Sequence, residues 1–356
     1  MKYLGFILGI VSLLVNKLFG LYPVLADRLY YRGLYQVVRA VYDHTLGLLP
    51  IPMVYVVFIL LIYLISERLK VLAQALLSPK PLLTKLEETV RSIVNPLGYV
   101  LFAFYILWGW NYQQTSFEDK MGLQPVRADT VALHIEALAV MDELSVLRRA
   151  VTGDDSHIQA TAIADDIEKH IREVQEELIA EWGEPTIGRV RIRELRPAGI
   201  LLRISTSGVY IPFVSEGHID AGLHPLQYPF TMAHEMAHGY GYTDEGVCNF
   251  ISYLTCLRSD DPMVRYSGVL GYWRYVLSNL RTYAPTSFME VRKQMPSPLR
   301  RDLQDIALQM DKYPDLMPTV RNAVYDSYLR SHGVQSGLAN YNDIVRLVAQ
   351  WKQRQE

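Results

Sequence analysis

The sequence predicts a mainly helical protein with a small β-sheet, in which a region of transmembrane helices precedes a soluble α+β domain. Long uncharged apolar runs are confined to residues 1–117. From residue 127 onward, apolar residues recur every three or four positions between charged ones, which is the period of amphipathic helices. Residues 189–213 instead alternate polar and apolar side chains, as half-buried strands do. We therefore expect a membrane region at residues 1–117 and a soluble domain at residues 127–356.

The composition agrees with this division. The chain has 356 residues, of which 50% are hydrophobic, and a formal net charge of -2, which suits a membrane region with one soluble domain. No basic stripe with interleaved aromatic residues is present, so we expect a lipid bilayer as partner and no nucleic acid. Cys248 and Cys256 lie about 12 Å apart along one expected helix, too far for a disulfide, and are expected to be buried and free.

Three transmembrane helices are expected, at residues 3–24, 48–66 and 94–112. A signal peptide is the alternative for the first run, because a positive start precedes it. The second run carries no charge, and the third lies within the charge-free stretch Ser92–Phe117. These two later runs favour a multi-pass membrane protein.

The basic residues between the expected spans predict the orientation. Residues 28–46, expected to form either an interfacial amphipathic helix or a connecting loop, contain three arginines. Because positive charge favours the cytoplasmic side, we expect the loop between the second and third spans to be cytoplasmic and the soluble domain to face outward. Lys120 and Arg127, which follow the third span, partly offset this bias. The loop residues that carry the argument are Arg68, Lys70, Lys80, Lys85 and Arg91.

The soluble domain is expected to begin with two helices and then change to strands. The helices are expected at Thr130–Val151 and Ile158–Trp182, and a polar loop at Glu216–Asp220 contains His218 and precedes His224. Strands are expected at Arg189–Leu195, Ile200–Thr206 and Val209–Phe213. Four further helices are expected at Met263–Tyr283, Leu299–Lys312, Thr319–Ser331 and from Asn340 to the end.

The stretch His234-Glu235-Met236-Ala237-His238 carries the chemistry. We expect it on a helix that begins near Thr231, a candidate N-cap, and ends at Gly239. Residues four apart share a helix face, so His234 and His238 can bind one zinc ion. Glu235 then lies beside the metal, where a carboxylate can accept a proton from metal-activated water.

A third metal ligand is expected at the start of the following helix. We favour Glu245, because Asn249 lies one turn further on and could orient a ligating histidine from the same face. Asp244 is the alternative, since it directly follows the glycine turn, and the acid that does not bind metal would be the helix N-cap. The competing interpretation of the whole cluster is a buried amphipathic helix whose histidines only form hydrogen bonds.

This arrangement resembles the gluzincin class of zinc peptidases, in which a glutamate on the next helix completes the site. Four segments are also similar to an uncharacterised bacterial family that has several membrane spans followed by a zincin-like domain. The resemblance implies that His234, His238 and Glu245 bind Zn²⁺ and that Glu235 is the base. With a bacterial family as the likeness and the charge bias of the loops setting the orientation, we expect the protein in the bacterial inner membrane with its soluble domain on the periplasmic side. Gly246-Val247-Cys248 departs from the more acidic and alanine-rich pattern of that family. The similar segments are Trp108–Tyr112, Tyr210–Phe213, His234–Phe250 and Val324–Leu329.

The expected function is that of a membrane-anchored zinc metallopeptidase acting on a peptide or protein substrate. By analogy, the strand Val209–Phe213 is a candidate edge for binding an extended peptide, with an ordinary buried strand as the alternative. The other possible function is that of a catalytically silent metal-binding membrane protein that binds a peptide or an envelope partner. An intramembrane protease is disfavoured, because residues 219–245 contain too many polar residues and prolines to lie in lipid. The sequence does not predict the oligomeric state. It also does not select the residue that would donate a hydrogen bond to the oxyanion of the tetrahedral intermediate; the candidates are Tyr266, Tyr325, Tyr328, His332 and Tyr341.

Overall fold

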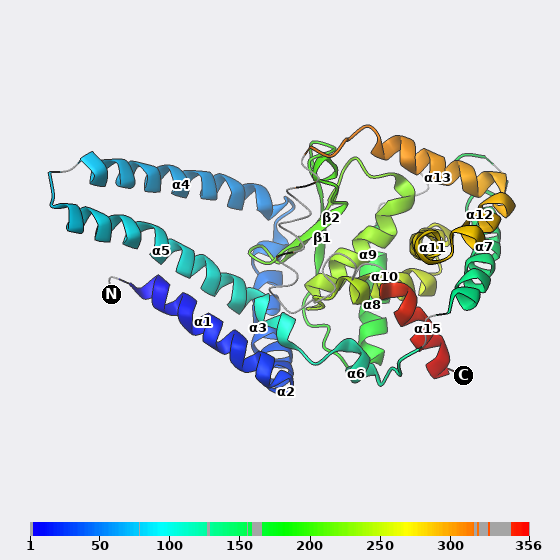
Figure 1. Cartoon of the computed structure of the whole chain (residues 1–356), viewed down its shortest axis with the longest axis horizontal. Coiled ribbons are helices and arrows are strands. Elements are labelled where there is room, and N and C mark those ends of the chain that lie inside the picture. The colour runs from blue at the N-terminus through cyan, green and yellow to red at the C-terminus, as the bar shows by residue number, and fades with distance from the viewer. Residues whose placement is uncertain are drawn as a thin grey trace. The chain divides into compact units, whose positions relative to one another are not determined.

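The computed structural model describes residues 3–77, 79–126, 129–154, 156–158, 166–316, 319, 327 and 343–355. These residues form a mainly helical protein with a small three-stranded sheet, as the sequence predicts (Figure 1). The chain divides into two compact units. Unit 1 comprises Met1–Thr115, Ile187–Arg189 and Ile211–Glu216, and unit 2 comprises Ser116–Thr186, Val190–Tyr210 and Gly217–Glu356.

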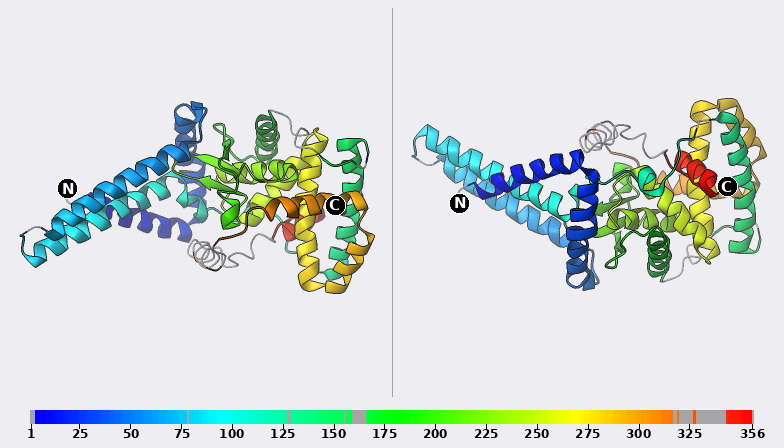
Figure 2. Two further views of the ribbon diagram at one scale, coloured as in Figure 1. Left: turned by 90° about the horizontal axis from the view of Figure 1, so that it is seen from above. Right: turned by 90° about the horizontal axis from the view of Figure 1, so that it is seen from below.

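Unit 1 contains three long helices and several short ones. Among the described residues, two helices are long and apolar enough to cross a membrane, α1 (Leu4–Leu21) and α5 (Leu82–Leu107). The third long helix, α4 (Met53–Leu77), runs beside α5, and both views of Figure 2 show the pair. The short elements are α2 (Pro23–Leu25), the π-helix η1 (Ala26–Leu34), α3 (Tyr35–Asp43) and the 3-10 helices η2 (Leu46–Leu48) and η3 (Gly109–Gln113).

The bounds of these helices differ from the expected spans. In the expected span 48–66, the long helix α4 begins only at Met53, after a stretch that contains two prolines, Pro50 and Pro52. Every 18-residue stretch of α4 includes Glu67, Arg68 and Lys70, so α4 is not one of the two apolar helices. The expected span 94–112 lies on α5, which begins twelve residues earlier and gives way to η3. Residues 28–46 are largely helical, in η1 and α3.

Helices α1 and α5 pack through glycines. A Cβ added at Gly98 would lie 2.2 Å from the carbonyl oxygen of Gly5, and one added at Gly9 would lie 2.9 Å from the Cα of Gly98. The Phe6 backbone N–H donates to Oδ1 of Asn95 at 3.2 Å. Such small-residue contacts let backbones approach closely and are typical of helix pairs in membranes.

Unit 2 contains the metal-ligand motif and most of the sheet. Its strands are β1 (Arg191–Leu195), β2 (Gly208–Ile211) and β3 (Glu216–Asp220), in the order β1-β3-β2, with Ile211 and Glu216 grouped in unit 1. The first helices are α6 (Phe117–Met121), α7 (Thr130–Thr152) and α8 (Ile167–Glu181), and short 3-10 helices are η5 (Leu202–Ile204) and η6 (Pro225–Gln227). The later helices are α9 (Tyr228–Gly239), α10 (Glu245–Arg258), α11 (Pro262–Tyr283), α12 (Pro285–Gln294), α13 (Ser297–Met310) and α15 (Ile344–Gln355).

Two expectations for the sheet region are wrong. The expected strand Ile200–Thr206 contains η5, and the expected polar loop Glu216–Asp220 is the central strand β3, whose five residues are all buried. One carboxylate explains both differences. Asp220 accepts backbone N–H groups of Gly199, Leu201 and Leu202, at 2.7, 2.7 and 3.1 Å, so it folds that segment into a turn while its own charge is satisfied inside the protein.

Most helices of unit 2 agree closely with the expected ranges. Helix α8 begins at Ile167, after its N-cap Asp166, so the expected start at Ile158 is wrong, since Ile158 itself is not helical. Residues 159–165 lie outside the described part of the chain, as does most of the expected helix Thr319–Ser331. Helix α10 forms the centre of the core: its residues from Glu245 to Cys256 are buried, and it packs against α8, α9, α11 and α15. Cys248 and Cys256 are free and buried on this helix, as predicted.

Candidate metal centre

Helix α9 carries the motif and begins earlier than expected. Its first residue is Tyr228, with Pro229 in the first turn, and the expected N-cap Thr231 instead lies buried inside the helix. The 3-10 helix η6 runs directly into the start of α9. His224 is the N-cap of η6 and accepts the Leu226 backbone N–H at Nδ1. The helix ends at Gly239, as predicted, and the chain then turns toward α10.

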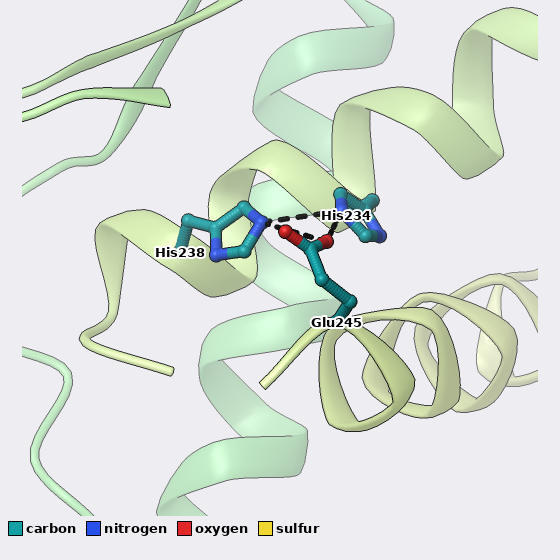
Figure 3. Close-up of side chains that lie close together, drawn as sticks. All are labelled: His234, His238 and Glu245. Carbon is teal, nitrogen blue, oxygen red and sulfur yellow. Dashed lines mark hydrogen bonds and ion pairs between the residues drawn. The ribbon is translucent and has the colours of Figure 1, made fainter. Parts of the chain in front are cut away.

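The two adjacent acids before α10 have different roles. Asp244 is the N-cap, and its Oδ1 accepts the Val247 backbone N–H at 2.9 Å. Glu245 is the first residue of the helix, and its side chain points at the two imidazoles of α9 (Figure 3). Its Oε2 lies 3.1 Å from Nε2 of His234 and 3.5 Å from Nε2 of His238. The structure therefore brings Glu245, not Asp244, together with the histidines.

The three side chains form a small triangle of possible ligand atoms. The third side of the triangle joins Nε2 of His234 to Nε2 of His238, which are 3.2 Å apart. A tetrahedral zinc ion with bonds of about 2.0–2.1 Å separates its ligand atoms by about 3.3–3.4 Å. The three sides of 3.1, 3.2 and 3.5 Å match this spacing, so His234, His238 and Glu245 could hold one metal ion.

Both imidazoles are oriented so that Nε2 carries the lone pair. Nδ1 of His238 lies 2.9 Å from the carbonyl oxygen of Tyr242, an atom that can only accept. Nδ1 of His234 lies 2.9 Å from Oδ1 of Asn249. Each ring therefore donates through Nδ1, which leaves Nε2 free to bind a metal, and the partners hold the rings in place.

Glu235 lies between the histidines on α9 and is almost fully buried. Burial raises its pKa to about 7, although the two histidines act in the opposite direction. Among the described residues, its Oε2 has no hydrogen-bond partner. A buried carboxylate oxygen without a partner is costly, so this atom is suited to receive a water molecule or a ligand.

Two glycines of the sheet accommodate the Glu235 side chain. A Cβ added at Gly208 on β2 would lie 2.5 Å from Oε1 of Glu235, and one added at Gly217 on β3 would lie 2.8 Å from Cβ of Glu235. The sheet order places β2 at an edge. The carboxylate of Glu235 therefore lies directly against the backbone of an edge strand.

The charges of the site suit a cation. Although burial opposes it, the neighbouring histidines hold the pKa of Glu245 well below its ordinary value, so this carboxylate is ionised. The thiol of Cys248 lies 3.4 Å from Nδ1 of His238, on the opposite edge of the ring from Nε2. Burial raises the pKa of Cys248 to about 11. Its sulfur contacts the Nδ1 side of His238 and is not part of the cluster of ligand atoms, which His234, His238 and Glu245 form.

One known family matches residues 30–349, which include the whole motif. The chain belongs to the family DUF3810, described as a protein of unknown function. That description names neither a zinc peptidase nor a multi-pass membrane protein. No curated protein and no solved structure matches the chain. Functional argument for this DUF3810 chain therefore rests on the geometry of its site.

The structure adds one residue to the site that the sequence did not single out. The side chain of Tyr275 on α11 hydrogen-bonds with that of Asn249, and burial raises the pKa of Tyr275 to about 12, so its hydroxyl stays protonated. Helical periodicity could not select it, because α11 contains four tyrosines at different angles around its axis.

The other expected candidates have different places. The hydroxyl of Tyr266 donates to Oδ2 of Asp302 at 2.6 Å within a buried network that includes Arg148, so Tyr266 is part of the core. His218 is buried in β3, and His224 caps η6. Tyr325, Tyr328, His332 and Tyr341 lie outside the described residues.

Proposed function

We propose that this protein is a membrane-anchored zinc-dependent metallopeptidase. His234, His238 and Glu245 would hold Zn²⁺, and Glu235 would be the general base. The observation that carries the proposal is the triangle of ligand atoms with sides of 3.1, 3.2 and 3.5 Å, formed beside a buried carboxylate oxygen that has no partner among the described residues.

The ligand set supports zinc in a catalytic role. Two neutral imidazoles and one carboxylate form a mixed nitrogen and oxygen set, which is the set used by many zinc hydrolases. Three protein ligands leave a fourth position in a tetrahedral site, and catalytic zinc sites keep that position for water or substrate. The carbonyl oxygen of Tyr242 and the amide of Asn249 would keep the imidazoles aligned during turnover.

The chain's own residues supply the proton transfers. Bound zinc would lower the pKa of a water molecule and polarise the scissile carbonyl. Glu235 would accept a proton from the attacking water at Oε2 and then deliver it to the leaving amine. Burial raises the pKa of Glu235 above its ordinary value, which strengthens this carboxylate as a general base.

The edge strand supports a peptide as substrate. Extended peptides bind proteins by pairing with an exposed strand edge, and the backbone at Gly208 of β2 lies against the carboxylate of Glu235. A peptide paired with this strand would therefore carry its backbone carbonyls past the base. The resemblance to gluzincins, in which an edge strand has this role, agrees with the arrangement.

The proposed membrane anchor is supported by segments of the three long helices of unit 1 that carry no charged residue. Gly5 of α1 lies against Asn95 and Gly20 lies against Gln113, so α1 and α5 run in the same direction. Helix α5 lies beside both α1 and α4, and neither Met53–Ser66 of α4 nor Ser92–Leu107 of α5 contains a charged residue. We call these two segments, together with the charge-free residues 4–16 of α1, the uncharged band, and Lys17 of α1 lies outside it. Its surface is rich in exposed large apolar side chains, which suits lipid.

The same region supports the proposed orientation. Residues 67–91, which lie beyond the uncharged band, contain five basic residues. By the positive-inside tendency, this end would face the cytoplasm of a bacterial inner membrane, and the metallopeptidase part would act on the periplasmic side.

One observation favours a second candidate function, a catalytically silent protein that binds metal and a peptide or envelope partner. His234, Glu235, His238 and Glu245 are only 9, 4, 7 and 5% exposed. A substrate carbonyl can reach such a site only if covering side chains move. A protein that keeps the metal purely for stability would have no need of access.

Metal analysis combined with peptide hydrolysis tests both candidates. We expect the purified wild type to hold one zinc ion and to cleave members of a peptide library. Glu235→Gln should retain zinc and lose cleavage, because an amide cannot accept the proton, whereas a double change of His234 and His238 to alanine should lose zinc. Zinc without cleavage in the wild type would favour the silent alternative, and undiminished cleavage by Glu235→Gln would contradict the assigned base.

A further inference from the structure

A cavity of about 360 Å³ lies between α4 and α5, near the ends that residues 78–81 connect. Its charged lining consists of three basic residues and one acid, Arg68, Lys80, Arg91 and Glu88. Leu72 and Pro96 contribute apolar wall. The lining therefore carries an excess of two positive charges in a partly apolar setting.

The two guanidinium groups are available for a ligand. Glu88 is occupied by Lys80, whose Nζ lies 2.6 Å from its Oε1. Arg68 makes no ion pair with any residue that the structure describes, and Arg91 acts on Glu88 only through its charge. Lys80 and Glu88 thus offset each other, and the net positive charge of the cavity resides on Arg68 and Arg91.

The cavity lies at the border of the uncharged band. Asn95 lines it, and the same side chain accepts the backbone N–H of Phe6 in the first turn of α1. Ser92, the first residue of the charge-free part of α5, also lines it. On α4, Arg68 follows the last residue of the charge-free part, Ser66, by two positions. If the band lies in the hydrocarbon core, the cavity is at the level of the lipid headgroups.

We propose that this cavity binds the phosphate group of an anionic phospholipid. Two guanidinium groups match phosphate oxygens as paired donors, and basic pockets between membrane helices are suited to anionic headgroups. A lipid fits better than free phosphate because apolar side chains continue from the cavity along the helices. Ile93 and Leu97 of α5 are 49 and 62% exposed and would contact the acyl chains. This inference rests on the membrane anchoring within the proposed function and is independent of zinc and of catalysis.

Lipid-dependent stability of the full chain in detergent tests the proposal. We would measure thermal unfolding with added phosphatidylglycerol, phosphatidylcholine or inorganic phosphate, and count bound phosphatidylglycerol by native mass spectrometry. The wild type should be stabilised by phosphatidylglycerol selectively. The double change Arg68→Gln and Arg91→Gln should weaken that effect by about tenfold or more, since it removes the charge-assisted donors.

A matched variant controls for net charge. Lys70→Gln with Lys85→Gln removes two positive charges from the same end of unit 1 but changes no residue that lines the cavity, so this variant should bind phosphatidylglycerol as the wild type does. Arg68→Lys with Arg91→Lys keeps the charge but loses the planar fork, and an intermediate loss is expected. This variant also serves if the glutamine pair does not fold.

Three results would overturn the proposal. The first is an equal loss of stabilisation by phosphatidylglycerol in the two double glutamine variants. The second is stabilisation of the wild type by phosphatidylcholine as strong as that by phosphatidylglycerol. The third is the same stabilisation by inorganic phosphate alone. Failure of the anchor is a separate outcome: a chain that purifies without detergent and does not float with phosphatidylcholine vesicles would contradict membrane insertion itself. A chain that inserts but shows no preference for phosphatidylglycerol would contradict only the lipid site.

Discussion

Replacing Gly208 by alanine should reduce catalysis while leaving the metal and the fold in place. The new Cβ would lie 2.5 Å from Oε1 of Glu235, whereas ordinary van der Waals contact begins at 3.4 Å, so the carboxylate must move by about 0.9 Å. The three nearest atoms all belong to the Glu235 side chain, which can rotate away at small cost in stability. A misplacement of about 1 Å in a catalytic group lowers turnover by about a hundredfold.

The assay compares peptide hydrolysis, zinc content and thermal unfolding of Gly208→Ala with those of the wild type. The control is Gly33→Ala, because Gly33 lies in η1 and its added Cβ would meet only ordinary contact at 3.4 Å. We expect kcat to fall about a hundredfold in Gly208→Ala, with zinc content unchanged. Full activity in this variant would refute the placement of Glu235 as the base. Loss of zinc together with activity would show that β2 supports the ligands themselves.

Three further predictions follow from other parts of the molecule. Asn249→Ala removes the partner of Nδ1 of His234 and should weaken zinc affinity by about 10–100-fold in a chelator competition, whereas Asn249→Asp should retain it. Equal affinity in all three proteins would exclude an orienting role. Without metal, the folded state binds more protons than the unfolded state between the ordinary pKa of 4.5 and the raised pKa of about 7 for Glu235, so stability should fall as pH rises through this range. Denaturation in chelator should show this slope in the wild type and a shallower one in Glu235→Gln, and identical slopes would contradict the raised pKa. Gly98→Leu would force a side chain against the Gly5 carbonyl oxygen and should lower the unfolding temperature, whereas Gly20→Ala meets only the flexible end of Gln113 and should be tolerated. Equal stability of these two variants would argue against the close packing of α1 and α5.

Local periodicity accounts for what the sequence predicted well. Helices α7, α11 and α13 lie within a few residues of their expected ranges, because apolar residues at helical spacing and strong caps act over a few positions. The position of His234 and His238 on one face of α9 follows from the same helical period of about 3.6 residues. The prediction of the sheet region was wrong because a buried polar residue there is satisfied by groups distant in the sequence. Asp220 accepts hydrogen bonds from backbone N–H groups within residues 199–202.

By itself, the amino-acid sequence determined the helical character of the chain, the apolar N-terminal runs and the shared face of the two histidines, since each depends on neighbours within one or two turns. Only the tertiary structure decided that Glu245 meets these histidines while Asp244 caps the helix, that Gly208 lies against Glu235, and that Tyr275 reaches Asn249. These contacts join different elements, and their distances depend on how α9, α10, α11 and the sheet pack. Side-chain spacing along one helix carries no information about that packing.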